Sequence, residues 1–173
     1  MKIVFAGTQS TGKTTLVNKM QESGLFNDYD FVTSIPRSLG NPFGVDGNDK
    51  TQQDIMLTHL SNLQKPNFIA DRGILDCFTY TLYQFNNKKI QAATLLNQLD
   101  TLNQITDYDK IFFIRPEFEI VDDGVRSLDK EFQDEVNAIY EQVIQYIGED
   151  KVVIISGDIE TRFNQILKSL EIN

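Results

Sequence analysis

Short runs of apolar residues alternate along the chain with longer segments in which apolar residues recur every three or four positions. The short runs are uninterrupted, which is typical of strands buried on both faces of a parallel sheet. Four such runs stand at residues 3–6, 68–70, 111–114 and 152–155, and Phe31 and Val32 form a weaker candidate. The pattern therefore predicts strands spread over the whole length of the chain.

Amphipathic helices are predicted between and after these strands. Apolar residues share one helical face in the segments 90–105, 132–147 and 159–170, and the run 13–20 is also compatible with a helix. Alternating strands and helices form right-handed crossovers, which place a parallel sheet between two layers of helices. Ligands bind such a sheet beyond the carboxyl ends of its strands, so we expect functional side chains in the segments that follow the strands.

The segment after the first strand, Gly7–Thr14, reads GTQSTGKT and matches the phosphate-binding pattern GxxxxGK[ST] in full. Glycines at both ends of this pattern allow a close backbone approach, so that N–H groups of the loop and the next helix converge on phosphate oxygens. Lys13 places a positive charge beside the β- and γ-phosphates, and the Thr14 hydroxyl can bind Mg²⁺. The expected nucleotide contacts are Gly7, Thr8, Gln9, Ser10, Thr11, Gly12, Lys13, Thr14 and Thr15.

A carboxylate and an arginine follow the strand at residues 68–70. Asp71 can bind Mg²⁺ through water or accept a proton from a substrate hydroxyl as a general base, and the sequence leaves both roles open. Arg72 has the planar fork that suits phosphate oxygens. The alternative is that Asp71 caps the next helix and that Arg72 is a solvated neighbour.

Further arginines follow other predicted strands and are candidate anion ligands. A mobile lid is expected at about residues 115–130, from which Arg126, or less favourably Arg115, closes over the phosphates. For Arg115 a surface ion pair is an equal alternative. Arg37 is expected to reach the acceptor substrate. Phe43 can stack on a base or ring of that substrate, although a side chain that covers the core is the better interpretation of Phe43.

Composition narrows the possible functions. A chain of 173 residues suits one domain, residues 1–173, and the net charge of −9 opposes a broad nucleic-acid surface. No apolar run approaches the length of a membrane span and the N-terminus lacks the pattern of a signal peptide, so we expect a cytoplasmic protein. Cys77 has no partner at metal-ligand spacing and is expected to be a small buried residue. His59 lies in a helical pattern and is expected to be a packed or rim residue.

Four segments together carry a resemblance to a known family: KIVFAGTQSTGKTTL, DRGILDCFTYT, DDGVRSLDKEFQ and VVIISGDIETRFNQI. From Met1 to about Leu170 the chain resembles P-loop nucleoside and nucleotide kinases, and most closely the NadR-type ribosylnicotinamide kinases of the AAA-type ATPase/kinase family. The resemblance implies a three-layer α/β P-loop NTPase fold with a five-stranded parallel sheet, in which the P-loop strand lies beside the Asp71 strand, and a small helical lid. It also implies ATP as donor and places Gly157 and Asp158 near the adenine.

Two functions agree with these features. The first is Mg²⁺- and ATP-dependent transfer of a phosphoryl group to a small nucleoside- or nucleotide-like acceptor, either a nucleoside monophosphate or a riboside. The second is a nucleotide-dependent switch that controls a protein partner. A guanine-binding N/TKxD segment is absent after the late strands. Relatives often carry a glutamate a few residues before the arginine that matches Arg37, and Ser34 stands there, which puts the acceptor in doubt.

Overall fold

The computed structural model describes residues 1–33, 46–117, 130–148 and 151–172. Strands and helices alternate along the described chain. The strands are β1 (Lys2–Ala6), β2 (Asp30–Val32), β3 (Phe68–Asp71), β4 (Lys110–Phe113) and β5 (Val152–Ile154). The helices are α1 (Lys13–Glu22), α3 (Asp49–Asn62), α4 (Ile74–Asn86), α5 (Ala92–Leu102), the 3₁₀ helix η2 (Asn103–Asp107), α6 (Lys130–Ile147) and α7 (Ile159–Ser169).

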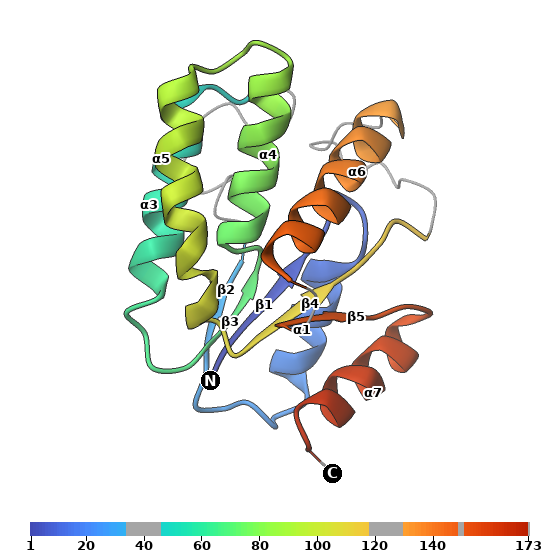
Figure 1. Ribbon diagram of the computed structural model, residues 1–173. Coiled ribbons are helices and arrows are strands. Elements are labelled where there is room, and N and C mark those ends of the chain that lie inside the picture. The colour runs from blue at the N-terminus through green and yellow to red at the C-terminus, as the bar shows by residue number, and fades with distance from the viewer. Residues whose placement is uncertain (34–45, 118–129, 149–150, 173) are drawn as a thin grey trace.

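The strands form one parallel sheet in the order β2-β3-β1-β4-β5, with the P-loop strand in the middle (Figure 1). β1 pairs with β3 so that Phe5 lies opposite Asp71, and with β4 on its other side. The carboxyl ends of β1 and β3 therefore lie next to each other, on the side of the sheet where the parallel strands end. This order confirms the predicted α/β fold and the adjacency of the P-loop and Asp71 strands.

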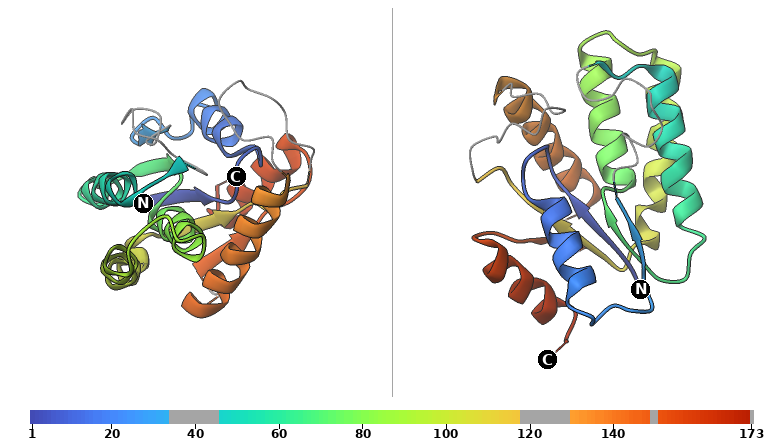
Figure 2. Two further views of the ribbon diagram at one scale, coloured as in Figure 1. Left: turned by 90° about the horizontal axis from the view of Figure 1, so that it is seen from above. Right: turned by 180° about the vertical axis from the view of Figure 1, so that it is seen from behind.

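Helices cover both faces of the sheet, as the alternating side chains of β1 require. Val4 and Ala6 pack into the larger cluster under α3, α4 and α6, and Ile3 and Phe5 pack into a second cluster under α1 and α7. Figure 2 shows these two helical layers from above and from behind. Uninterrupted apolar runs were the right pattern for the central strands because both faces of each are covered.

The sheet edge differs from the prediction. β5 was expected to be buried on both faces, but Val152 and Val153 are half-buried and Ile154 is 47% exposed. In the part of the chain that the structure describes, β5 pairs with β4 alone, and an edge strand receives less cover than a central one. The predicted helix at 90–105 is also shorter: α5 ends at Leu102 and the chain continues as the 3₁₀ helix η2.

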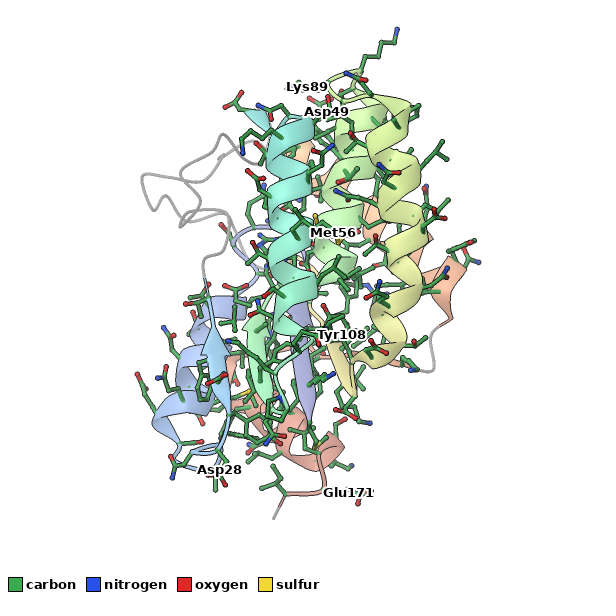
Figure 3. The ribbon with its side chains drawn as sticks, turned by 90° about the vertical axis from the view of Figure 1, so that its left-hand side faces the viewer. Asp28, Asp49, Met56, Lys89, Tyr108 and Glu171 are labelled. Atoms are coloured by element: carbon green, nitrogen blue, oxygen red, sulfur yellow. The ribbon has the colours of Figure 1, made fainter. Side chains whose placement is uncertain are left out.

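The layer of α3, α4 and α5 extends beyond the sheet on the side where the P-loop lies (Figures 1 and 3). Met56 of α3 and Tyr108, which follows η2, are buried inside this layer, whereas Lys89 lies at its exposed far end. Cys77 is buried in it, as predicted, and so is His59, which is therefore the packed residue and not the rim residue of its two expected positions. Among the described residues, no helix is long and apolar enough to cross a membrane.

Candidate active site

The P-loop leaves the carboxyl end of β1 and leads directly into α1, and glycines shape both of its ends. Gly7 has φ +141°, and a Cβ atom there would lie 2.4 Å from the carbonyl oxygen of Ile114, the residue that follows the neighbouring strand β4. Gly12 has φ +88° and stands at the N-cap of α1. Both positions are therefore closed to side chains, the first by contact as well as by conformation. Ser10 also has a positive φ of 59°, and its hydroxyl has no hydrogen-bond partner among the described residues.

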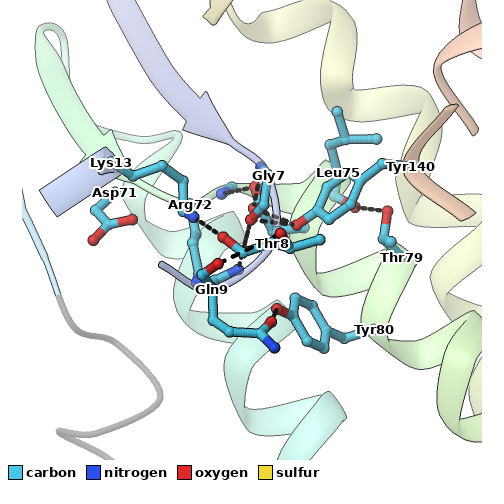
Figure 4. Close-up of polar contacts among 12 residues, drawn as sticks. Gly7, Thr8, Gln9, Lys13, Asp71, Arg72, Leu75, Thr79, Tyr80 and Tyr140 are labelled. Carbon is cyan, nitrogen blue, oxygen red and sulfur yellow. Dashed lines mark hydrogen bonds and ion pairs between the residues drawn. The ribbon is translucent and has the colours of Figure 1, made fainter. Parts of the chain in front are cut away.

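Lys13 is the first residue of α1 and folds back over its own loop. Its side chain is buried, and Nζ donates to the carbonyl oxygen of Thr8 (Figure 4). Nζ also donates, at 3.0 Å, to the hydroxyl of Thr11. Thr11 Oγ1 in turn donates to the Thr8 carbonyl at 3.1 Å. The ammonium group thus stands inside the curve of the loop, where a phosphate group would lie. Thr15, the last of the expected nucleotide contacts in this loop, is exposed on α1.

Thr14 and Asp71 meet across the gap between the P-loop and β3. The Thr14 hydroxyl donates to Asp71 Oδ2. The other carboxylate oxygen, Oδ1, is buried and has no hydrogen-bond partner among the described residues. Buried polar atoms are rarely left without a partner, so an unpaired carboxylate oxygen beside a hydroxyl fits a site that takes a hard cation or a substrate hydroxyl.

The alternative role of Asp71 as a helix cap is wrong. The N-cap of α4 is Gly73, and Asp71 is the last residue of β3. The cap carboxylate comes from Asp76, whose Oδ2 accepts a hydrogen bond from the Gly73 N–H at 2.9 Å. Asp71 is consequently free to point at the P-loop, which is where Figure 4 shows it.

Arg72 lies beside the first residue of the P-loop. Its Nη1 atom is 3.3 Å from the Gly7 carbonyl oxygen and 3.4 Å from Asp76 Oδ1, and its guanidinium lies 5.1 Å from the centre of the Tyr80 ring. Its φ is +93°, a conformation that costs a non-glycine residue about 1 kcal/mol or more and that clusters at functional sites. The arginine is thus held at the mouth of the loop by an anion, a carbonyl and an aromatic face.

Asp76 was not among the predicted site residues, yet it connects three parts of the site. Besides the Gly73 N–H, its carboxylate accepts the Tyr140 hydroxyl at 2.6 Å and the Gly7 N–H at 3.3 Å. Burial raises its pKa, an effect that Arg72 opposes. The capping-box position three residues after Gly73 is the one sequence signal that would have drawn attention to it.

Tyr140 belongs to the predicted apolar face of α6, and the structure adds a role for its hydroxyl. Tyr140 is fully buried, and burial together with the Asp76 carboxylate raises its pKa well above the ordinary value. The hydroxyl therefore stays protonated and donates. A second residue of α6, Gln133, donates from Nε2 to the Gln9 carbonyl at 2.9 Å, while the Gln9 side chain accepts from Tyr80.

Arg162 is the second functional candidate that the sequence analysis missed. It lies on the buried face of α7 with Ile166, and it donates from Nη1 to the Thr11 carbonyl at 2.7 Å. Its Nη2 atom is 3.1 Å from Glu117, which also accepts the Gly157 N–H at 2.8 Å. Arg162 and Glu117 thereby join the P-loop to the loop between β5 and α7.

Two predicted nucleotide contacts have other partners in this structure. Asp158 caps α7 by accepting the Thr161 N–H at 2.8 Å, and this hydrogen bond lowers its pKa. Arg115 forms a two-bond ion pair with Glu141, at 2.6 and 2.9 Å, and its side chain is 44% exposed. Arg115 thus matches the surface ion pair that was its stated alternative. The remaining predicted residues, Ser34, Arg37, Phe43 and Arg126, and most of the expected lid lie outside the described residues.

Solved structures with this fold include nucleoside kinases. Deoxyadenosine kinase from M. mycoides with the products dCMP and dCDP matches with a TM-score of 0.73 and 17% identity, over 99% of this chain and 98% of that one. NadR protein in complex with NR matches with a TM-score of 0.73 and 21% identity over 98% of this chain, and NadR with NAD and AMP-PNP with 0.68 and 19%. This chain covers 50% and 48% of those two NadR chains.

No curated protein matches the sequence significantly. The sequence model of one family does match, and its description is "AAA domain". The match runs over residues 2–162 and so includes the P-loop, β3 with Asp71, and Arg162. The fold, its structural neighbours and this match agree: the chain belongs to the AAA domain family and has the P-loop fold of nucleoside kinases.

Proposed function

We propose that this protein is a kinase that transfers the γ-phosphoryl group of Mg²⁺-bound ATP to a small nucleoside- or nucleotide-like acceptor. The observation that carries the proposal is the hydrogen bond between Thr14 and Asp71 beside a P-loop with a glycine at each end, where the other carboxylate oxygen has no partner among the residues that the structure describes. A hydroxyl and a carboxylate at this place are the protein ligands that P-loop enzymes use for Mg²⁺. The metal ion, when bound, would neutralise charge on the phosphate oxygens.

The nucleotide phosphates fit inside the P-loop. Lys13 is already within the curve of the loop, where it bonds Thr8 and Thr11. A bound phosphate would replace Thr8 and Thr11 as the acceptor of the Lys13 hydrogen bonds, because a charged acceptor makes a stronger hydrogen bond than a carbonyl or a hydroxyl. The Ser10 hydroxyl, which has no partner among the described residues, is a further donor for a phosphate oxygen.

Phosphoryl transfer needs alignment and positive charge more than it needs a covalent partner from the protein. Arg72 supplies a planar cation at the mouth of the loop. Asp71 has two compatible roles. It can hold a water molecule that is bound to the metal, or its Oδ1 atom can accept the proton of the acceptor hydroxyl while the oxygen of that hydroxyl bonds to the phosphorus atom. ADP leaves with the electron pair of the broken bond. Arg126 is the proposed lid arginine that closes over the phosphates, and Arg37 and Phe43 are proposed to contact the acceptor.

The acceptor class is proposed from likeness and from charge. Neighbouring structures carry deoxynucleotide products in one case and NR in another, so a nucleoside monophosphate and a riboside are both compatible acceptors. The net charge of −9 disfavours a polynucleotide. The second function considered, a switch that hydrolyses ATP to control a protein partner, uses the same loop but needs no acceptor.

A panel of acceptors distinguishes the two functions. ATP consumption is measured with Mg²⁺ and each of a set of ribosides, deoxyribonucleosides and nucleoside monophosphates, and the phosphorylated product is identified by mass spectrometry. Turnover that rises with one acceptor and yields its phosphate supports the kinase. Hydrolysis that no acceptor stimulates contradicts the kinase and leaves the switch.

A further inference from the structure

Gly7, the first residue of the P-loop, is held by side chains through both of its backbone polar groups. Its N–H donates to Asp76 Oδ1 at 3.3 Å, and its carbonyl oxygen lies 3.3 Å from Arg72 Nη1 and 3.2 Å from the Tyr140 hydroxyl. These three side chains come from α4, from the turn after β3 and from α6. Asp76 and Arg72 therefore fix the two polar groups of Gly7, and the Tyr140 hydroxyl lies against the same carbonyl oxygen.

The Asp76 carboxylate lies at the centre of these contacts. It is 1% exposed, and Tyr140, its shortest hydrogen-bond donor, is fully buried. Capping α4 needs only Oδ2, which accepts the Gly73 N–H. All three contacts of Oδ1 belong to the phosphate site or support it: the Gly7 N–H, the Arg72 guanidinium and the Tyr140 hydroxyl.

A buried carboxylate is costly unless donors surround it, and a neutral side chain can cap a helix at lower cost. The second oxygen of Asp76 therefore needs a reason other than the helix cap. The partners of Oδ1 supply that reason, because this oxygen contacts both the Gly7 N–H of the P-loop and the guanidinium of Arg72, a proposed catalytic cation. Tyr140 has one proton to give, and the 2.6 Å distance directs it to Asp76.

We infer that Asp76 and Tyr140 are positioning residues, which hold Gly7 and the Arg72 guanidinium in the geometry needed for phosphoryl transfer. This inference rests on the proposed kinase function. Neither side chain touches the nucleotide in this scheme, so neither is a catalytic residue. α6 supports the same loop a second time through Gln133, which bonds the Gln9 carbonyl. The pair thus sets where the P-loop begins and where Arg72 stands relative to it.

Tyr140→Phe is the sharper test, because Asp76→Asn would set an amide N–H against at least one of the donors around the carboxylate and threatens the fold itself. Tyr108→Phe is a matched control. Tyr108 is 3% exposed, and its hydroxyl accepts the Ile74 N–H at 3.0 Å, so both variants remove one buried tyrosine hydroxyl near the start of α4. Within the described ranges, no residue of the P-loop is hydrogen-bonded to Tyr108.

Three quantities are measured for each variant: kcat and KM for ATP with the best acceptor, the free energy of unfolding in urea, and the exchange rate of the Gly7 amide by NMR. In Tyr140→Phe we expect kcat to fall about tenfold while KM for ATP changes by less than about threefold, because positioning acts mainly as charge develops in the transition state. We also expect the Gly7 amide to exchange about tenfold faster in the folded protein. Tyr108→Phe should change kcat and Gly7 exchange by less than about twofold.

The inference is overturned if Tyr140→Phe and Tyr108→Phe have the same kcat, or if Gly7 exchange in Tyr140→Phe equals that of the wild type. A kcat loss that only follows the unfolded fraction in urea also overturns it. The proposed function fails separately, when the wild-type protein shows no acceptor-dependent turnover. In that case the Gly7 exchange rates still decide whether Asp76 and Tyr140 hold the loop.

Discussion

Replacing Asp71 with asparagine separates the chemistry of the site from its stability. Asparagine keeps the shape of the side chain and retains a carbonyl oxygen that accepts the hydrogen bond from the Thr14 hydroxyl. Its amide nitrogen would take the position of Oδ1, which has no partner among the described residues, so the new group is no worse paired than the old one. We therefore expect the free energy of unfolding to change by less than about 1 kcal/mol.

Activity should behave differently, because the substitution removes the negative charge. Whether Asp71 holds Mg²⁺ or accepts the acceptor proton, its loss should lower turnover by about 10²–10³-fold, which corresponds to about 3–4 kcal/mol of transition-state stabilisation. The assay is acceptor-dependent ATP turnover at several Mg²⁺ concentrations, with urea unfolding on the same samples. A raised Mg²⁺ requirement would indicate the metal-ligand role. An unchanged requirement with a lower kcat would indicate the general base.

Asp30→Asn is a suitable control for this experiment, because Asp30 begins the neighbouring strand β2 but is exposed and pairs only loosely with Lys65, at 3.5 Å. It should leave turnover within about twofold of the wild type. The reasoning is refuted if Asp71→Asn keeps turnover within a few-fold of the wild type. It is equally refuted if the variant loses activity only because it unfolds.

Three further predictions concern neighbouring residues. Lys13→Ala should lower turnover by on the order of 10²-fold or more, and turnover within a few-fold of the wild type would contradict the role of the P-loop. Arg162→Met should destabilise the protein by about 3 kcal/mol and weaken ATP binding, because it removes a buried cation from the Thr11 carbonyl and leaves Glu117 without its arginine; urea unfolding and ATP titration measure both. Burial, aided by Arg72, lowers the pKa of His59 to about 3. Since the unfolded chain then binds the proton more readily, stability should fall as the pH drops below 6.5, by up to about 1.4 kcal/mol per pH unit, and His59→Gln should flatten that slope in unfolding curves.

The centre of the fold could be predicted from local patterns. β1 and β3 read as uninterrupted apolar runs because they are buried on both faces, and the P-loop pattern is contiguous in sequence. The edge strand β5 carries the same kind of run but lacks a neighbour on one side, so Ile154 is exposed where burial was expected. An apolar sequence shows that a strand is compatible with burial, whereas the position of the strand in the sheet determines how much of its surface is buried.

The supporting residues of the site could not be predicted in the same way, because their roles come from contacts between distant elements. Tyr140 was correctly placed on the apolar face of α6, but its hydroxyl meets Asp76 only after α4 and α6 pack together. Arg162 sits in an amphipathic helical pattern, and its contact with the P-loop joins residues 151 positions apart. A single polar atom on an apolar helix face does not change the hydrophobic pattern, so the pattern cannot predict what that atom contacts.

The position of β2 has a consequence for how the proposed kinase can diverge. β2 is a three-residue strand at the edge of the sheet, β3 is its one partner strand within the described ranges, and its side chains are at most half-buried. Substitutions in β2 disturb less of the core than those in β1, because Phe31 and Val32 are only partly buried whereas the side chains of Ile3 to Ala6 are buried under both helical layers. If the acceptor is bound from this edge, selection can exchange one acceptor for another while the phosphate-handling centre stays unchanged, and mutational libraries aimed at new acceptors are best confined to β2 and the segment after it.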